Sequence, residues 1–249
     1  QLDAGAIALD LRREQHLADA DQLCRLGTAY KDKEGAVRLK FPPKEIIVND
    51  LIAGECRFVP QSLGSEPVLV RSDGLPTYHL ASVSDDVAMG ITHVIRGIDH
   101  LTNTAKHQLM FQALSEQPPQ FAHLPLILGE DGTKLSKRRI SDLTSLSEFQ
   151  GAGYLAEAVI NFLLLLGWSH PEHKEVLTLA EAVASFDLER VGHTASIFNR
   201  SRLDWLNGLW IRKLPPELLV ERLIPFLGEW RELVQARGTG YTQAALAAF

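Results

Sequence analysis

The apolar and polar positions first set apart a mixed N-terminal region. Residues 1–34 are polar and rich in Ala, Leu and Asp, and the loose helical spacing of their leucines predicts the end of a helix followed by a loop. From Ala36 onwards, short β-type runs separated by Pro and Gly predict a small antiparallel sheet that ends near Ser72. These runs are Ala36–Phe41, Glu45–Val48 and Val68–Arg71.

The next stretch has the rhythm of an α/β protein. Ile91–Ile95 is a short apolar run, Thr104–Leu114 has amphipathic helical spacing, and Leu124–Leu128 is a second apolar run that ends before Gly129. Strand, helix and strand in this order predict a right-handed βαβ unit of a parallel sheet. Because ligands bind beyond the carboxyl ends of such strands, we expect chemistry at residues 96–100 and 129–139.

From about residue 141 onwards the pattern is helical. The segments 145–148 and 178–181 both fit the capping box, in which a hydroxyl and a carboxylate satisfy the free N–H groups of a first helical turn. A helix over Tyr154–Leu166 ends at Gly167, and one over Leu203–Leu214 ends before two prolines. We expect a helical bundle with short connections.

Composition and charge narrow the function only partly. The 249 residues carry a formal net charge of −6, which argues against nucleic-acid binding through uniform positive charge and leaves binding through a local patch open. The two cysteines, Cys24 and Cys56, have no neighbours spaced as metal ligands, so we predict neither a disulfide framework nor a structural zinc site. The longest apolar run, Phe162–Leu166, is far shorter than the roughly 20 residues of a membrane-spanning helix, and the first residues show no targeting pattern.

The segment Lys134–Arg139 is the most informative for chemistry. It reads K-L-S-K-R-R and follows an apolar strand and the turn Glu130–Gly132. Such a cluster of cations can stabilise the charge that develops on a transferring or leaving phosphate. The alternative is a solvated basic turn, since lysine-rich loops are common.

Two further segments offer groups for a polar substrate. Tyr78 opens a predicted helix that continues to Gly90, and its phenol either lines a pocket or packs against the helix start. Arg96 follows a strand, where its guanidinium can either clamp a carboxylate or form an ion pair with Asp85, Asp86 or Asp99. Asp99 and His100 are candidates for ribose or adenine contacts, or they cap the next helix.

Together these segments resemble glutamyl-tRNA synthetase of the bacterial and organellar type. The resemblance covers residues 36–228 and depends on five motifs in order. They are SDGLPTYHLASVSDDVAMGITHVIRG (72–97), NTAKHQLMFQAL (103–114), FAHLPLILGEDGTKLSKR (121–138), GYLAEAVINFLLLLGWS (153–169) and FNRSRLDWLNGLWIR (198–212).

The resemblance implies roles for particular residues. KLSKR is the family's form of the mobile class I signature loop, which implies that Lys137, assisted by Lys134, stabilises the adenylation transition state. ATP and Mg²⁺ would be used to make glutamyl-adenylate, and glutamate would then be transferred to tRNA. The implied ATP contacts are Lys137, Ser136, Asp99, His100 and Ile127; the implied glutamate contacts are Tyr78, Arg96 and Ser82; the implied tRNA contacts are Arg138 and Arg139.

The chain departs from the family pattern at several positions. Ser82 stands where the family has Asn, Ile98 stands where it usually has an acidic residue, and Arg139-Ile140 replaces the usual HG. The HxGH signature that holds the ATP phosphates from the opposite side is absent from the 249 residues. We therefore expect that this polypeptide alone does not activate glutamate, because one lysine loop cannot replace a two-sided site.

The expected fold class is α/β, the C-terminal half of a class I Rossmann-type catalytic domain, followed by an all-α stem-contacting domain. By resemblance, residues 1–71 are a remnant of the inserted acceptor-binding region, 72–140 the second catalytic half, 141–214 the helical domain and 215–249 the start of an anticodon-binding domain. The family implies a monomer in the bacterial cytoplasm, or in the mitochondrial matrix or plastid stroma of a eukaryote.

Several alternatives to a glutamate-specific ligase remain. A catalytically inert tRNA-binding module derived from a synthetase is one, and the glutamyl-queuosine tRNA(Asp) synthetase paralogue is another, although that paralogue ends soon after its signature loop. A glutaminyl enzyme has a different form of signature loop. An unrelated nucleotide-binding α/β protein is supported by fold alone.

Overall fold

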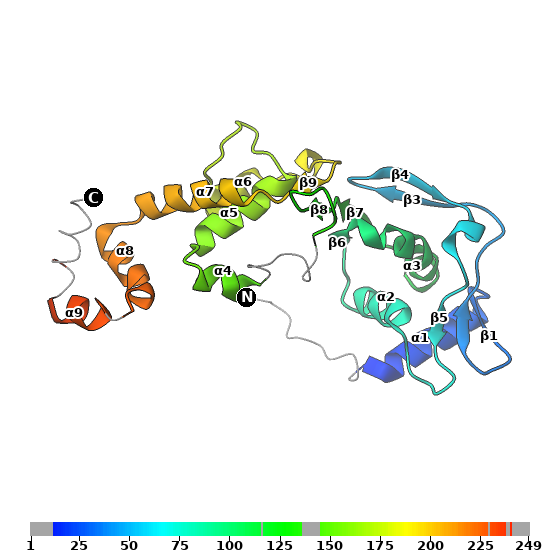
Figure 1. Ribbon diagram of the computed structural model, residues 1–249. Coiled ribbons are helices and arrows are strands. Elements are labelled where there is room, and N and C mark those ends of the chain that lie inside the picture. Colours follow the sequence, from blue (N-terminus) through cyan, green and yellow to red (C-terminus); the bar gives the residue numbers. More distant parts are fainter. Residues whose placement is uncertain (1–11, 116, 136–144, 229, 238–239, 241–249) are drawn as a thin grey trace. The chain divides into compact units, whose positions relative to one another are not determined.

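The computed structural model describes residues 12–115, 117–135, 145–228, 230–237 and 240 (Figure 1). The chain divides into two compact units, Gln1–Leu126 and Ile127–Phe249. The first unit is a layered α/β structure and the second is mainly helical, so the predicted fold class is confirmed.

A four-stranded sheet in the order β4-β3-β7-β6 forms the centre of the first unit. Strand β6 (His93–Gly97) leads through η3 (Ile98–His100) and α3 (Leu101–Leu114) to β7 (Gln120–Leu124), which pairs with β6 in parallel. The predicted βαβ unit is thereby confirmed.

The second strand of that unit was predicted too late in the chain. It ends at Leu124, whereas the prediction began there and extended to Leu128. Pro125 has no N–H to donate to a ladder, so the apolar run is split in two. Its second part, β8 (Ile127–Leu128), pairs in parallel with β9 (Ser196–Ile197) in the second unit.

The early β-type runs do not form one antiparallel sheet, which corrects the prediction. Strands β1 (Ala29–Lys31), β2 (Val37–Leu39) and β5 (Val68–Val70) make a three-stranded antiparallel sheet. Strand β3 (Ile46–Asp50) instead pairs with β4 (Gly54–Phe58) and joins β7 in parallel. Alternate residues of β3 are buried, which places its apolar side chains in the same core as those of β7.

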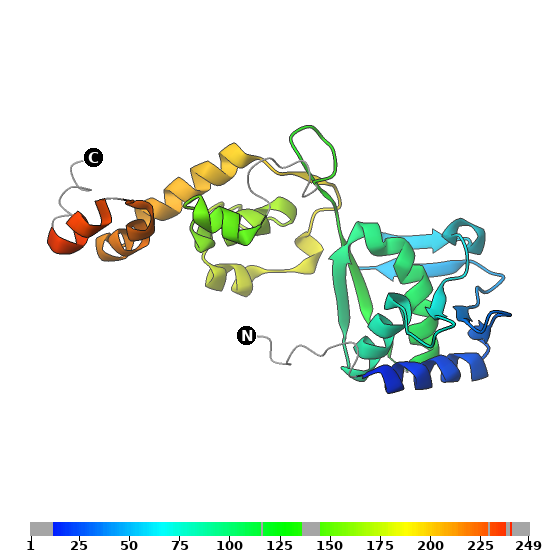
Figure 2. The same ribbon diagram turned by 60° about the horizontal axis from the view of Figure 1, so that its bottom comes forward.

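Three helices share this core with the strands. Helix α1 (Arg13–Arg25) packs against α2 (Tyr78–Ala88), and α3 packs against α2 and β3 (Figure 2). Short 3₁₀ turns, η2 (Pro60–Leu63) and η3, connect strands to the next elements. The fully buried side chains of the core include Leu23, Leu39, Val48, Leu69, Leu80, Val83, Met110 and Phe111.

The second unit packs its helices around α5 (Ala156–Gly167) and α7 (Arg200–Lys213). Both predicted capping boxes are present, at the starts of α4 (Leu146–Gly151) and α6 (Leu179–Ser185). The remaining elements are η4 (Leu188–Arg190), α8 (Pro216–Leu223), η5 (Ile224–Phe226) and α9 (Trp230–Arg237).

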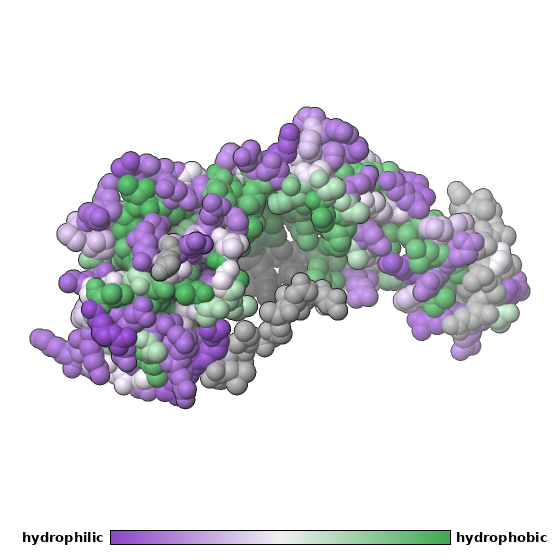
Figure 3. Space-filling model, turned by 180° about the vertical axis from the view of Figure 1, so that it is seen from behind, coloured by the Kyte–Doolittle hydropathy of each residue, from purple (hydrophilic) through white to green (hydrophobic). Residues whose placement is uncertain are grey.

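The surface of both units is mixed, with apolar side chains among hydrophilic ones (Figure 3). At the sheet of the first unit, Ile95 and Leu124 are exposed. Within the described part of the chain, every helix is too short or too polar to cross a lipid bilayer.

Candidate functional site

The polar groups of the first unit gather where β6 ends. Arg96 is the fourth residue of β6, and its guanidinium turns toward the first turn of α3. Its Nη2 donates to Thr104 Oγ1 at 2.6 Å and to the carbonyl of His100 at 3.4 Å. Its Nε donates to His123 Nε2 at 3.3 Å, across the parallel pair β6–β7.

Arg96 forms no salt bridge with any described carboxylate. Of the three aspartates that were alternative partners, Asp85 instead pairs with Arg12, which precedes α1, and with His16 in its first turn, at 3.1 and 2.9 Å. Burial lowers the pKa of Arg96, while the nearby phenol of Tyr78 and carboxylate of Asp86 favour its charged form. A half-buried guanidinium in this state is suited to receive an external carboxylate.

Aromatic rings line the side of the site formed by α2 and α3. Tyr78 is the first residue of α2, is 53% exposed, and has its ring centroid 5.9 Å from that of His107. His79 Nδ1 lies 3.1 Å from His107 Nε2. Burial, together with the charge of Arg96, lowers the pKa of His107 to about 3, so this imidazole is neutral at physiological pH.

Ser82 lies one helical turn after Tyr78. Its Oγ donates to the carbonyl of Tyr78 at 2.8 Å, within the same helix. The hydroxyl hydrogen is therefore engaged, and the oxygen can act toward a ligand only as an acceptor.

Asp99 and His100 lie in η3, directly after β6. His100 occupies the N-cap position of α3 without a side-chain capping bond, so it does not cap the helix as the alternative proposed. Its carbonyl accepts from Arg96 Nη2 and lies 3.3 Å from Thr104 Oγ1. A Cβ at Gly97 would lie 2.6 Å from Asp99 Oδ1, so a larger residue there would require the Asp99 carboxylate to move.

Ile127 and Lys134 are on a hairpin of the second unit. Leu135 donates its backbone N–H to the carbonyl of Ile127 at 3.1 Å, and Lys134 forms an isolated antiparallel β-bridge with Leu128. The predicted turn is confirmed: Gly132 donates to the carbonyl of Gly129. Lys134 is exposed. The other residues predicted in this loop, Ser136, Lys137, Arg138 and Arg139, lie outside the described residues.

Sequence reasoning missed a buried hydrogen-bond chain behind Arg96. Asp50 at the end of β3, His123 in β7 and Thr104 in α3 link to one another and to the guanidinium. The sequence does contain a signal for it. Asp50 and His123 each lie in a β-type apolar stretch, and because burying a polar group without a partner is costly, each is expected to have a hydrogen-bond partner.

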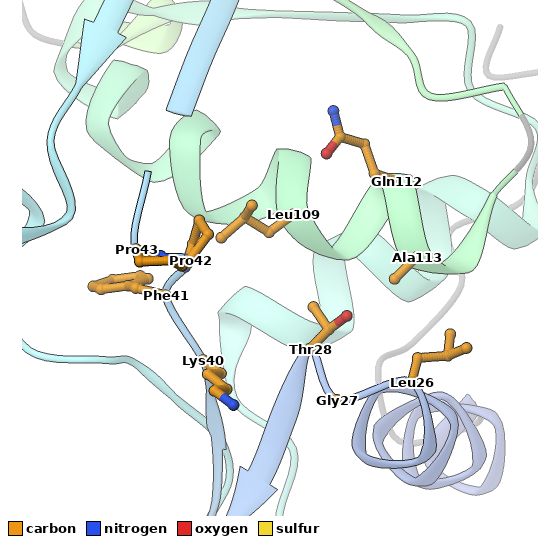
Figure 4. Close-up of a pocket in the computed structure, with 10 residues that line it drawn as sticks. All are labelled: Leu26, Gly27, Thr28, Lys40, Phe41, Pro42, Pro43, Leu109, Gln112 and Ala113. Carbon is orange, nitrogen blue, oxygen red and sulfur yellow. The ribbon is translucent and has the colours of Figure 1, made fainter. Parts of the chain in front are cut away.

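A separate pocket of about 500 Å³ lies between the α1–β1 turn, the segment after β2, and α3 (Figure 4). Figure 4 shows Pro42 beside Leu109 of α3. Lys40 is the only charged side chain among the ten described residues that line it. Within the described ranges, no group of three or more His, Cys, Asp or Glu side chains could hold a metal ion.

The first unit has three parallel strands with the guanidinium of Arg96 near their carboxyl ends, and a lysine-bearing hairpin and helices follow along the chain. This order of elements fits the catalytic domain of a class I aminoacyl-tRNA synthetase. Residues 10–205 match the family model described as tRNA synthetases class I (E and Q), catalytic domain, and the chain belongs to this family.

Within the family, the resemblance to glutamyl-tRNA synthetase is confirmed. The chain is 48% identical over 195 residues to a glutamate–tRNA ligase of Synechococcus sp. (strain JA-3-3Ab), covering 78% of this chain and 40% of that protein. It is 45% identical over 237 residues to the glutamate–tRNA ligase of Dehalococcoides mccartyi (strain ATCC BAA-2266 / KCTC 15142 / 195), covering 92% and 48%.

Solved structures agree. A glutamate tRNA ligase from Elizabethkingia meningosepticum CCUG26117, in complex with its amino acid, superposes with a TM-score of 0.80 at 28% identity, covering 91% of this chain and 59% of that one. Glutamate-tRNA synthetase from Elizabethkingia anophelis gives 0.71 at 33% identity, covering 85% and 45%. The chain thus spans less than half the length of the two curated relatives described above.

Proposed function

We propose that the protein is a glutamate–tRNA ligase and that this chain contributes the groups that bind the side-chain carboxylate of glutamate. The observation that carries this proposal is Arg96, a half-buried guanidinium that forms no salt bridge with a described carboxylate. The curated relatives bear that name, and the Elizabethkingia meningosepticum structure is a complex with its amino acid.

The chemistry of Arg96 favours glutamate over glutamine. A carboxylate accepts hydrogen bonds from a guanidinium, and its negative charge strengthens them. The neutral side-chain amide of glutamine has one acceptor oxygen, and its NH₂ group is a donor that would face the N–H donors of Arg96. The exposed ring of Tyr78 lies beside the guanidinium, where it can cover the aliphatic part of the substrate.

The proposed reaction has two steps. An oxygen of the α-carboxylate attacks the α-phosphorus of ATP, the bond to the bridging oxygen breaks, and pyrophosphate leaves. A terminal ribose hydroxyl of tRNA then attacks the carbonyl carbon, and AMP leaves. Mg²⁺ would accompany ATP and neutralise phosphate charge. Lys137 and Lys134 would stabilise the first transition state, with Ser136, Asp99, His100 and Ile127 on the nucleotide and Arg138 and Arg139 on tRNA.

The test is glutamate-dependent ATP–pyrophosphate exchange by the natural gene product. We expect exchange with glutamate and not with glutamine, and loss of exchange in Lys137→Ala. In Arg96→Lys we expect the glutamate KM to increase about 100-fold, since a lysine ammonium cannot reproduce the fixed, planar donors of the guanidinium. An exposed control, Lys174→Ala, should behave as wild type. Absence of exchange in the wild type, with tRNA binding retained, would instead establish the inert tRNA-binding module.

A further inference from the structure

The carboxyl ends of three adjacent strands contribute to one buried chain of hydrogen bonds behind Arg96. Asp50 ends β3, His123 is in β7, and Arg96 is in β6, directly opposite His123 in the parallel register. The side chains of Asp50 and His123 are both fully buried. We propose that Asp50 and His123 are positioning residues that hold the Arg96 guanidinium in the orientation that receives the substrate carboxylate.

Asp50 is held as an anion. One carboxylate oxygen accepts the backbone N–H groups of Ile52, Ala53 and His123 at 3.0, 2.8 and 3.0 Å. Burial opposes its ionisation, but these backbone donors and the imidazole of His123 leave the pKa of Asp50 below its usual range. The second oxygen is free to accept the ring N–H of His123 at 2.5 Å.

This contact determines the tautomer of His123. Burial lowers the pKa of His123 despite the neighbouring carboxylate, so the ring is neutral and carries its single proton on Nδ1, facing Asp50. Nε2 is therefore an acceptor. The donors placed around it are Thr104 Oγ1 at 2.9 Å and Arg96 Nε at 3.3 Å.

These buried hydrogen bonds therefore restrain the guanidinium at two of its nitrogens. Nε is held by His123, and Nη2 is held by Thr104, whose oxygen also contacts His123. None of these bonds uses Nη1, so the donors of Nη1 stay outside the buried hydrogen-bond chain. The phenol of Tyr78 is a hydrogen-bonding neighbour of the same guanidinium. A guanidinium that is already aligned loses less side-chain entropy when the substrate binds. The buried hydrogen bonds to Arg96 therefore contribute to the affinity for glutamate.

Asp50→Asn is the most direct test, because it keeps the size of the side chain and reverses the tautomer. The asparagine NH₂ would donate to His123 Nδ1, so the imidazole proton would move to Nε2 and face the donors of Arg96 and Thr104. In serine proteases, replacing the triad aspartate by asparagine acts through the same change of tautomer. We expect the glutamate KM to rise by about 10- to 100-fold, with the ATP KM and kcat nearly unchanged.

A matched pair at His123 separates positioning from simple structural damage. His123→Gln can return an acceptor oxygen to the place of Nε2, whereas His123→Asn is too short to do so. We expect the first to recover much of the glutamate affinity that the second loses. His93→Asn, which removes an exposed imidazole from β6, serves as the control and should match wild type. Equal glutamate KM values in the two His123 variants would overturn the proposal.

This inference rests on the proposed function, and the two can fail separately. If Arg96→Lys leaves the glutamate KM of the natural gene product unchanged, the proposed role of Arg96 fails. If Arg96→Lys raises it but Asp50→Asn does not, only the positioning role fails. The double variant that combines Arg96→Lys and Asp50→Asn gives a further test. If its increase in glutamate KM equals the product of the two single increases, the positioning role is refuted, because a residue acting through Arg96 loses its effect once Arg96 is replaced. Circular dichroism on each variant identifies unfolding, in which case Thr104→Val replaces Asp50→Asn in the same comparison.

Discussion

Replacement of Asn161 by alanine should destabilise the second unit severely. Asn161 in α5 is 1% exposed, and its Oδ1 accepts from the backbone N–H of Leu177 at 3.0 Å and from Trp210 Nε1 at 3.1 Å. Its Nδ2 donates to the carbonyl of Glu175 at 3.1 Å. One side chain thus ties the segment before α6 to the facing helix α7.

The magnitude follows from the groups left behind. Leu177 and Trp210 are both buried, so water cannot replace the lost acceptor, and each unsatisfied N–H costs about 1–3 kcal/mol. Glu175 is exposed, so water can satisfy its carbonyl. The two buried donors and the small void together give a loss of roughly 4 kcal/mol, a large part of the ~5–15 kcal/mol of a typical domain.

Urea unfolding followed by tryptophan fluorescence measures this loss. All four tryptophans, at positions 168, 205, 210 and 230, belong to the second unit, so the signal reports on that unit. Gln150→Ala removes an exposed polar side chain from α4 and should change the free energy of unfolding by less than about 0.5 kcal/mol. A loss below about 1 kcal/mol in Asn161→Ala would refute the reasoning.

Three further predictions concern other sites. Thr178→Ala removes a capping box and should lower the free energy of unfolding by about 1 kcal/mol in the same urea assay; an unchanged midpoint would contradict it. Burial and the charge of Arg96 lower the pKa of His107 in the folded protein to about 3, so the unfolded chain binds more protons between about pH 6.5 and 3. The free energy of unfolding should therefore fall as the pH decreases through this range, by up to about 1.4 kcal/mol per pH unit. His107→Gln should flatten this slope in circular-dichroism melts. Gly97→Ala places a Cβ 2.6 Å from Asp99 Oδ1 and should raise the ATP KM roughly tenfold in pyrophosphate exchange, whereas Gly151→Ala, with open space around it, should not; equal values would contradict the predicted nucleotide role of Asp99.

Local signals in the chain predicted the regular elements well. The capping boxes that precede α4 and α6 were predicted from four-residue patterns, because a hydroxyl and a carboxylate at that spacing satisfy donors within one turn. Helix α3 and the strand before it were predicted from periodicity, and their order alone implied a parallel pair. The motifs around Tyr78 and Arg96 led to the correct family.

Strand boundaries and strand partners were predicted less well. The apolar run 124–128 predicts one strand, although Pro125 divides it between β7 and β8. Strand β3 was assigned to an antiparallel sheet with its sequence neighbours, whereas it joins β7, more than 70 residues later. A period of two residues indicates which face of a strand is buried, but not which strand lies beside it.

The sequence by itself determined the family, the positions of most helices and the place of Arg96 at the end of a parallel strand. Only the tertiary structure showed what lies behind that arginine. Asp50, Thr104 and His123 are separated by up to 73 residues. Thr104 and His123 lie within family motifs, but no pattern in the sequence linked any of the three to Arg96. They meet because β3, β7 and β6 end at the same edge of one sheet, and the low polarity of that edge makes each buried group find a partner among the others.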